Sequence, residues 1–264
     1  MSKNILPILL AALLAITGTG VSTVWADKDK DDDDDKGASI EFAAQDVFFE
    51  FNSSDLDLGI HIFFDAEAWR RVTVRGPDGK IFEVKNDGGL KRIGSTEVFT
   101  ESAEPALVDD PEEATAEEIM EAIRTFQARF PEGDYEFRGK TINGNTLVGT
   151  AELRHSLPVP VSLDLDSFPL VRWTDNSQPG DPEIVGYEVI VEIVAEQDGE
   201  EKVFVNTANF PAIQTSFTTS SEFFDLFEHL QNEGELVELK VEVIATEESG
   251  NKTITEETIF EQEE

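Results

Sequence analysis

The chain of 264 residues contains no cysteine. That absence excludes a disulfide framework, even in an oxidising compartment where one could form, and it excludes lipid attachment to a cysteine. It also removes the thiolate ligands on which most structural zinc sites depend. The fold must therefore be held by a hydrophobic core. The 39% of hydrophobic residues, with 19 Phe among them, are enough for one or two ordinary domains.

Positive charge is scarce. The chain has 20 Lys and Arg against 56 Asp and Glu, so its formal net charge is −36 at neutral pH. An electrostatic field of that sign repels nucleic acid and anionic lipid, and both are excluded as expected partners. The same field keeps the chain dispersed in salt and attracts cations.

Residues that carry chemistry are also few. The three histidines, His61, His155 and His229, do not lie at the spacing of paired metal ligands. The sequence has no Gly-x-Ser-x-Gly, no phosphate-binding loop and no Gly-x-Gly-x-x-Gly. Acidic pairs are unavoidable among 56 Asp and Glu, so they do not single out a glycosidase. We therefore assign no catalytic, cofactor-binding or metal-binding residue and expect that the protein is not an enzyme.

Long apolar runs are confined to the start of the chain. Lys3 precedes an apolar stretch over residues 5–17, and Val24-Trp25-Ala26 ends on a small residue, which is the layout of a secretory signal peptide over residues 1–26. The alternative is an uncleaved anchor, but the stretch is shorter than the roughly 20 residues that span a bilayer. No later segment is apolar enough to span a membrane. We expect an exported protein, periplasmic or extracellular, that is soluble after cleavage.

A run of charge, "DKDKDDDDDKG", occupies residues 27–37. Calcium loops alternate carboxylates around a turning glycine and end on a bidentate Glu, whereas Asp31 to Asp35 are consecutive. Adjacent like charges keep a chain extended, so the run is interpreted as an acidic disordered spacer. Two alternatives remain, which are weak binding of divalent cations such as Ca²⁺ and a tag-like protease-recognition sequence, "DDDDK".

Residues 38–156 predict a β-rich first domain. "LDLGIHIFF" alternates apolar and polar residues, "GPDG" predicts a hairpin turn and "NGN" a second one. Between these hairpins, "ATAEEIMEAIRTFQARF" has helical spacing, and Thr115 with Glu118 forms a capping box. We expect one amphipathic helix near 115–129, packed on the sheet of an antiparallel, sandwich-like domain.

Residues 157–262 carry a family resemblance. Trp173 closes an early strand, "GYEVIVEIV" follows, and a late strand "LKVEVIAT" leads through the polar turn "EESGN" into the last strand. This order resembles a fibronectin type III domain, which implies a β-sandwich with Trp173 in its core. The tyrosine that the family places six residues before Ala245 is Leu239 here, and "SSEFFDLFEHL" has a helical pattern. We expect an embellished member, so the fold class is mainly β with two antiparallel β-sandwich-like domains.

Two binding hypotheses rest on single residues. Asp55, Asp57 and Asp65 could converge at a strand end as a calcium site, or they could simply form polar strand faces and a loop. Trp69, between "DAEA" and two arginines, could lie exposed and stack on a sugar ring.

These observations predict an exported, non-catalytic acidic protein that acts as an interaction or structural module, adhesion-like or spacer-like. Its expected partner is a protein or a cell surface. The alternative is an accessory module that binds carbohydrate or calcium, and a carboxylate-based glycoside hydrolase is the third hypothesis.

Overall fold

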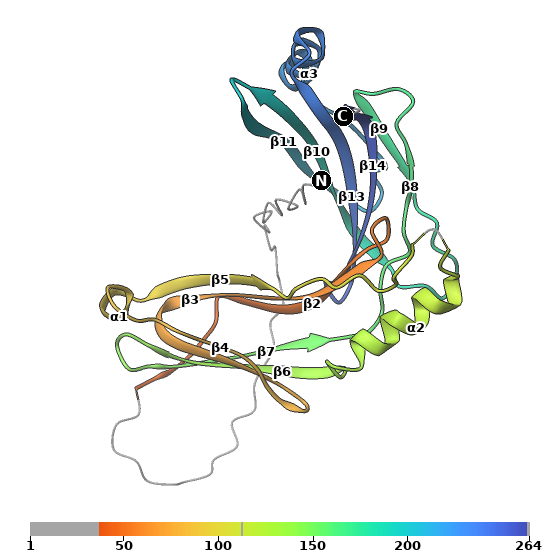
Figure 1. Cartoon of the computed structure of the whole chain (residues 1–264). Coiled ribbons are helices and arrows are strands. Elements are labelled where there is room, and N and C mark those ends of the chain that lie inside the picture. The colour runs from red at the N-terminus through yellow and green to blue at the C-terminus, as the bar shows by residue number, and fades with distance from the viewer. Residues whose placement is uncertain (1–36, 112, 263–264) are drawn as a thin grey trace.

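The computed structural model describes residues 37–111 and 113–262 (Figure 1). The predicted signal peptide and residues 27–36 of the predicted spacer lie outside the described residues. Strands dominate the described chain, and its three helices are α1 (Leu90–Ile93), α2 (Ala116–Gln127) and α3 (Ser221–Glu233). The mainly-β class is therefore confirmed. No helix of the described chain combines the length and the apolar character that crossing a bilayer requires.

The first unit is built on one long, bent strand. Its strands are β1 (Ser39–Glu41), β2 (Ala44–Asn52), β3 (Asp57–Gly76), β4 (Gly79–Lys85), β5 (Ser95–Glu101), β6 (Gly133–Thr141) and β7 (Thr146–Leu153). The first half of β3 pairs with β2 and β5, and its second half pairs with β4 and β6. Strand β3 thus passes from one layer to the other, and the first core fills the space between them (Figure 1).

The local predictions for this unit are confirmed. The "GPDG" turn joins β3 to β4, and the "NGN" turn joins β6 to β7. Helix α2 begins after Thr115, whose side chain and that of Glu118 form the predicted capping box. Phe126 is buried, and Ile119 and Ile123 pack against the first core, so the apolar stripe of α2 faces the sheet.

The second unit is a two-layer sandwich. Its strands are β8 (Ser162–Asp164), β9 (Leu170–Thr174), β10 (Ile184–Gln197), β11 (Glu200–Pro211), β12 (Ser216–Thr218), β13 (Leu236–Glu247) and β14 (Lys252–Glu261). Strands β14, β13, β10 and β11 form one layer and β12, β9 and β8 the other, with the second core between them. This is the arrangement that the fibronectin type III resemblance implies, and the resemblance is confirmed.

The two departures from that family that the sequence shows, at Leu239 and at the helical segment, are also present in the structure. Leu239 is fully buried in the core where the family has tyrosine. Helix α3 is inserted between β12 and β13 and buries Phe223, Phe227 and Leu230. Trp173 lies on the middle strand β9 with 3% of its surface exposed. An embellished sandwich is thus the correct description.

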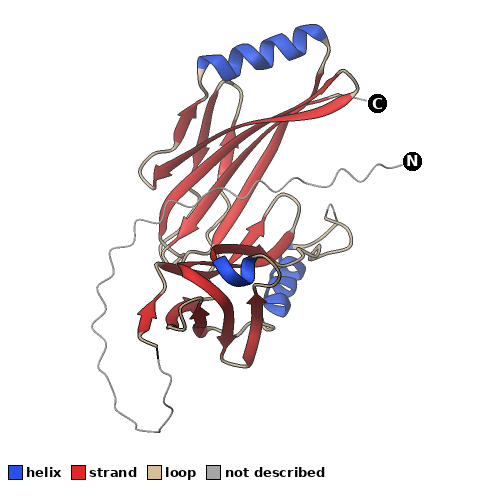
Figure 2. Cartoon of the chain, turned by 90° about the vertical axis from the view of Figure 1, so that its left-hand side faces the viewer, coloured by secondary structure: helices blue, strands red, loops and turns tan. Residues whose placement is uncertain are grey.

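The two units share one sheet. Strand β14 pairs with β2 in parallel, with Lys252 opposite Glu50 and Ile254 opposite Asn52. This seam (the β2–β14 pairing) makes an 11-stranded sheet that runs through both units. Figure 2 shows the strands of the second unit running down to the first, with α3 at the far end. The hydrophobic side chains nevertheless form two separate clusters, one on each side of the seam. The division of the chain into domains over residues 38–156 and 157–262 stays a prediction.

Candidate functional site beside the seam

A buried polar cluster lies next to the seam, on the face of the sheet opposite the two cores. In the β2–β3 ladder, Phe48 pairs with His61 and Glu50 pairs with Gly59. Because side chains alternate along a strand, these four positions share one face, while Phe49 and Ile60 point into the first core. Glu50 and His61 are therefore diagonal neighbours across two strands.

The third member of the cluster comes from the segment that follows β5. Backbone hydrogen bonds from Ser102 to the carbonyl of Ile60 and from Leu107 to the carbonyl of Leu56 hold this segment along β3. Gly59 leaves the space that the side chain of Glu104 occupies. A Cβ atom on residue 59 would lie 2.7 Å from Glu104 Oε1.

The carboxylates of this cluster converge on the imidazole. His61 Nε2 lies 3.7 Å from Glu50 Oε1 and 3.6 Å from Glu104 Oε1. His61 is 1% exposed, and neither ring nitrogen has a hydrogen-bond partner among the described residues. The ring stacks on Phe48 at 5.0 Å and meets the edge of Phe99 at 5.4 Å. Packing rather than hydrogen bonding therefore fixes the orientation of the imidazole.

Lys252 ties this cluster to the second unit. Its Nζ lies 3.5 Å from Glu50 Oε2 and 5.0 Å from the centre of the Phe48 ring. Glu50 thus contacts Lys252 through one oxygen and faces His61 with the other.

Negative charge exceeds positive charge around the cluster. Burial, and then repulsion from Glu104, raises the pKa of Glu101 to about 7. Burial, and then repulsion from Glu104 and Asp55, also raises the pKa of Asp57 to about 7. Burial is the larger cause of both shifts, and repulsion between neighbouring carboxylates adds to it. This part of the face favours either bound protons or a bound cation.

The polar face continues across the seam onto the second unit. Lys240 on β13 lies 2.9 Å from Glu242 and 3.6 Å from Glu256. Burial raises the pKa of Glu188 and of Glu192 on β10. The same side of the sheet is thus acidic and partly buried in both units.

The three aspartates predicted as a calcium site are not brought together. Asp65 lies eight residues beyond Asp57 on β3, a distance of about 26 Å along an extended strand. Asp55 and Asp57 do lie close enough for Asp55 to raise the pKa of Asp57. Within the described residues, the group with three metal-ligating side chains in reach of one another is Glu50, His61 and Glu104, whose ligand atoms lie within 4.8 Å.

Trp69 does not lie on the surface. Its side chain is 1% exposed and meets Phe64 edge-on at 5.6 Å inside the first core. The hypothesis that Trp69 stacks on a sugar ring is therefore wrong. The other two histidines are separate from the cluster, because His155 Nε2 lies 2.8 Å from the carbonyl oxygen of Phe130 and His229 is exposed on α3.

Asn251, in the turn between β13 and β14, holds the seam. Its Oδ1 accepts a hydrogen bond from the backbone N–H of Phe49 at 2.7 Å, and its Nδ2 donates to the carbonyls of Arg154 and Ser156 at 2.9 and 2.6 Å. Thr253 Oγ1 donates to the carbonyl of Pro158 at 2.8 Å. Asn251 is fully buried, so each of these bonds replaces one to water.

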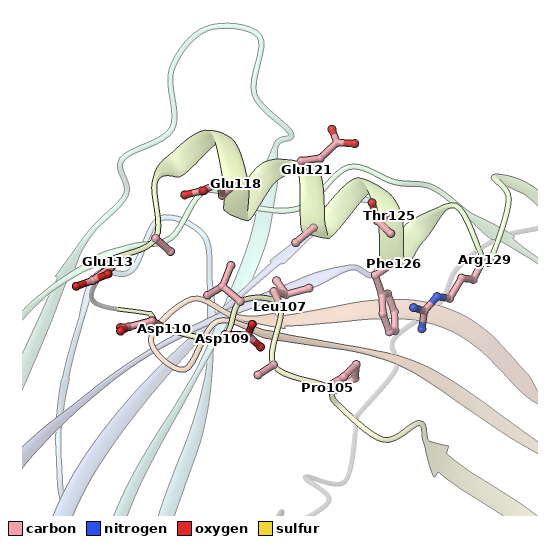
Figure 3. A pocket seen from close by; sticks show the side chains of 14 residues that line it. Pro105, Leu107, Asp109, Asp110, Glu113, Glu118, Glu121, Thr125, Phe126 and Arg129 are labelled. Atoms are coloured by element: carbon pink, nitrogen blue, oxygen red, sulfur yellow. The ribbon is translucent and has the colours of Figure 1, made fainter.

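A separate groove of about 730 Å³ lies between α2 and residues 105–110, 113 and 114 (Figure 3). Figure 3 shows Phe126 and Arg129 at the C-terminal end of α2. The labelled acidic side chains come from the helix and from the segment that precedes it. The acidic residues that line it, all exposed, are Asp109, Asp110, Glu113, Glu118 and Glu121. Carboxylates this open to water are solvated, so the groove differs in kind from the buried cluster.

Sequence reasoning missed both the cluster and the residue that holds the seam. The spacing of the histidines along the chain could not reveal the cluster. Glu50, His61 and Glu104 meet only through strand pairing and the path of the segment after β5. One signal was present, since His61 follows Gly59 on the polar side of an alternating strand. Asn251 gave no signal beyond its place in a polar turn.

No protein-family model and no curated protein matches the chain. Among solved structures, it is similar to a tetra-tandem repeat from the extending region of a large adhesion protein, with 15% identity and a TM-score of 0.22 over 83% of this chain and 50% of that one. A two-domain fibronectin type III segment from chicken tenascin shows 12% identity and a TM-score of 0.23, over 83% and 98% of the two chains. A structure concerned with host cell surface retention of a 1.5-MDa bacterial ice-binding adhesin shows 13% identity and a TM-score of 0.25. The match covers 81% of this chain and 63% of that one. The chain thus spans about half of the first of these structures.

Proposed function

We propose that the protein is an exported, non-catalytic, adhesion-like structural module whose two β units form one rigid body. The observation that carries this proposal is the seam. The main-chain ladder between β2 and β14 and the buried hydrogen bonds of Asn251 join the two units over and above the covalent linker.

Rigidity distinguishes this arrangement from two domains that are joined only by a flexible linker. Two domains joined only by a linker move relative to each other by default. Here a relative rotation would break ladder hydrogen bonds and leave the backbone N–H of Phe49 without a partner in a dry environment. A module of this kind holds whatever surface its far end presents at a fixed distance and orientation.

The remaining parts of the proposal come from composition. The signal-peptide pattern over residues 1–26 and the net charge of −36 fit an exported protein that stays dispersed in salt. Its partner would be a protein or a cell surface. The carbohydrate alternative has lost the aromatic platform on which it depended, because Trp69 is buried. The cation-binding alternative keeps support from the acidic face beside the seam.

The test of rigidity uses the absence of cysteine, which allows site-specific spin labels. Cysteines for the labels replace Ile93 in the first unit and Ile213 in the second. These two isoleucines are 67% and 94% exposed, so labels there should not disturb the fold. Double electron–electron resonance between the labels should give one narrow distance distribution. Asn251→Ala should broaden it, and Asn209→Ala, at an exposed position on β11, should not. A broad distribution in the parent protein would overturn the proposal.

The non-catalytic part needs a test of its own. The purified exported protein is screened against polysaccharides and glycoside substrates with calcium present. Saturable binding without turnover supports a binding or spacing role. Turnover that disappears when one Asp or Glu is changed would show a carboxylate hydrolase instead.

A further inference from the structure

We propose that Glu50, His61 and Glu104 bind one divalent transition-metal ion of the zinc type beside the seam. The ligand atoms are His61 Nε2 and one carboxylate oxygen from each glutamate. The inference goes beyond the proposed structural role and does not depend on it.

The spacing of the three atoms suits such an ion. Zinc lies about 2.0–2.2 Å from nitrogen and oxygen ligands, so two of its ligands in tetrahedral geometry are roughly 3.4 Å apart. His61 Nε2 lies 3.6 and 3.7 Å from the two glutamate oxygens, slightly more than that separation and too far for hydrogen bonds. All three ligand atoms lie within 4.8 Å of one another, so rotation of the two glutamate side chains would complete three protein ligands, with a water in the fourth position.

The histidine indicates a ligand independently of the carboxylates. A buried ring nitrogen without a partner costs free energy, and Nε2 of His61 points at two carboxylates while bonding to neither. A metal ion would satisfy that nitrogen and both carboxylate oxygens together. Calcium and magnesium prefer oxygen ligands alone, whereas imidazole with carboxylate suits zinc and its neighbours.

The surroundings favour a cation and control access to it. Lys252 Nζ lies 3.5 Å from Glu50 Oε2 and leaves Glu50 Oε1 directed at His61, while among the described residues no cation other than the imidazole itself forms an ion pair with Glu104. Phe48 and Phe99 cover the imidazole, which reduces competition from water. The Glu104 side chain is 17% exposed, so an ion can enter from its side.

Gly59 provides a way to displace one ligand without removing it. Its missing Cβ is the space that Glu104 fills, with Oε1 2.7 Å and Cγ 2.8 Å from where a Cβ would stand. Gly59→Ala should therefore push the flexible Glu104 side chain out of the cluster, while all three ligands and the total charge of the protein are kept.

The experiment titrates Zn²⁺ into the chelator-treated exported protein by calorimetry, with excess Mg²⁺ present to occupy the exposed carboxylates. Co²⁺ serves as a second probe, because its visible absorption reports nitrogen and oxygen ligation in a tetrahedral site. We expect one Zn²⁺ per chain. Removing even an outer-shell partner of a metal typically costs 10-fold or more in affinity, so His61→Gln, Glu104→Gln and Gly59→Ala should each weaken binding at least about tenfold.

Two matched controls separate this site from adventitious binding. His229→Gln removes an exposed histidine on α3, and Glu97→Gln removes an exposed carboxylate on β5. Both should leave Zn²⁺ affinity unchanged. Far-UV circular dichroism and melting temperature establish that each variant is folded. If His61→Gln does not fold, the Zn²⁺ affinity of Glu104→Gln tests the proposed site instead.

The proposal is overturned by any of three results. The first is no Zn²⁺ binding in excess Mg²⁺, and the second is binding that survives His61→Gln and Glu104→Gln. The third is binding of Ca²⁺ alone, which would show a carboxylate site without the histidine. None of these results bears on rigidity, which the spin-label distances test separately.

Discussion

Asn251 Nδ2 donates a hydrogen bond to the carbonyl oxygen of Ser156 over 2.6 Å. The two residues come from opposite units, since Asn251 lies in the turn between β13 and β14 and Ser156 follows the last strand of the first unit. The same amide also bonds to the backbone of Arg154 and Phe49. One buried side chain thus fixes the β2–β14 seam and the start of the linker together.

Asn251→Ala should lower the free energy of unfolding by about 2–5 kcal/mol. The change leaves the buried N–H of Phe49 and two carbonyls without partners, and a buried unpaired group costs about 1–3 kcal/mol. Urea unfolding followed by circular dichroism measures the loss. Asn209→Ala on the exposed edge of β11 is the control and should change stability by no more than about 0.5 kcal/mol. Equal, small effects of the two changes would contradict the role given to Asn251.

Trp173→Ala should destabilise the protein by about 3–5 kcal/mol, as large-to-small aromatic changes in a core do. The Trp173 ring packs edge-on against Tyr187 at 5.4 Å and lies 6.0 Å from Phe210. Ile213→Ala, at a side chain that is 94% exposed, provides the comparison and should have little effect. A loss under about 1 kcal/mol for Trp173→Ala would mean that the ring does not support the second core.

The features predicted from the sequence are those that local chemistry decides. The capping box of Thr115 and Glu118 satisfies helix N–H groups within one turn, and the "GPDG" and "NGN" turns set the hairpins from their own residues. The seam and the metal-ligating cluster depend on which strands pair. The residues around Lys252 in the sequence do not indicate that it will pair with Glu50 in a neighbouring strand.

Trp69 shows why one surface prediction failed. Two arginines follow it, and strict alternation would place Arg70 and Arg71 on opposite faces of the sheet. The register of β3 against β5 shifts between Asp65 and Trp69, so Trp69 faces the core although strict alternation from Phe64 would turn it outward. A second shift, against β6 between Trp69 and Arg71, leaves both arginines exposed. Such a bulge adds one residue to a strand and reverses the expected faces beyond it. Alternation alone cannot locate it.

Asp46 predicts a pH dependence of stability. Burial raises its pKa to about 6 in the folded protein, against 3.8 for the ordinary carboxyl, so the folded state holds this proton more tightly than the unfolded state. The contribution of Asp46 is therefore most favourable below about pH 4 and is lost as the pH rises through about 6. Asp46→Asn keeps an acceptor for the N–H of Val47 and removes the titration.

The measurement for Asp46 is the free energy of unfolding between pH 4 and 7 for the parent and for Asp46→Asn. The fall in stability with rising pH should be smaller in the variant across that window. Asp109→Asn, which removes an exposed carboxylate of the groove beside α2, should leave the slope as it is in the parent. Parallel curves for the parent and Asp46→Asn would show that Asp46 does not titrate differently in the two states.

The seam should also make the two units unfold together. The experiment uses the chain without residues 1–26, which lacks Trp25. Trp69 lies in the first core and Trp173 in the second, so Trp173→Phe then leaves a fluorescence reporter for the first unit and Trp69→Phe one for the second. With the seam intact, the unfolding curve of each single-tryptophan protein should coincide with its own circular dichroism curve, because opening one unit breaks the ladder that the other needs. Adding Asn251→Ala should separate fluorescence from circular dichroism in at least one of them, and adding Asn209→Ala should not. If the curves already separate with Asn251 in place, the two units unfold independently, and the seam is a contact between them rather than part of one cooperative structure.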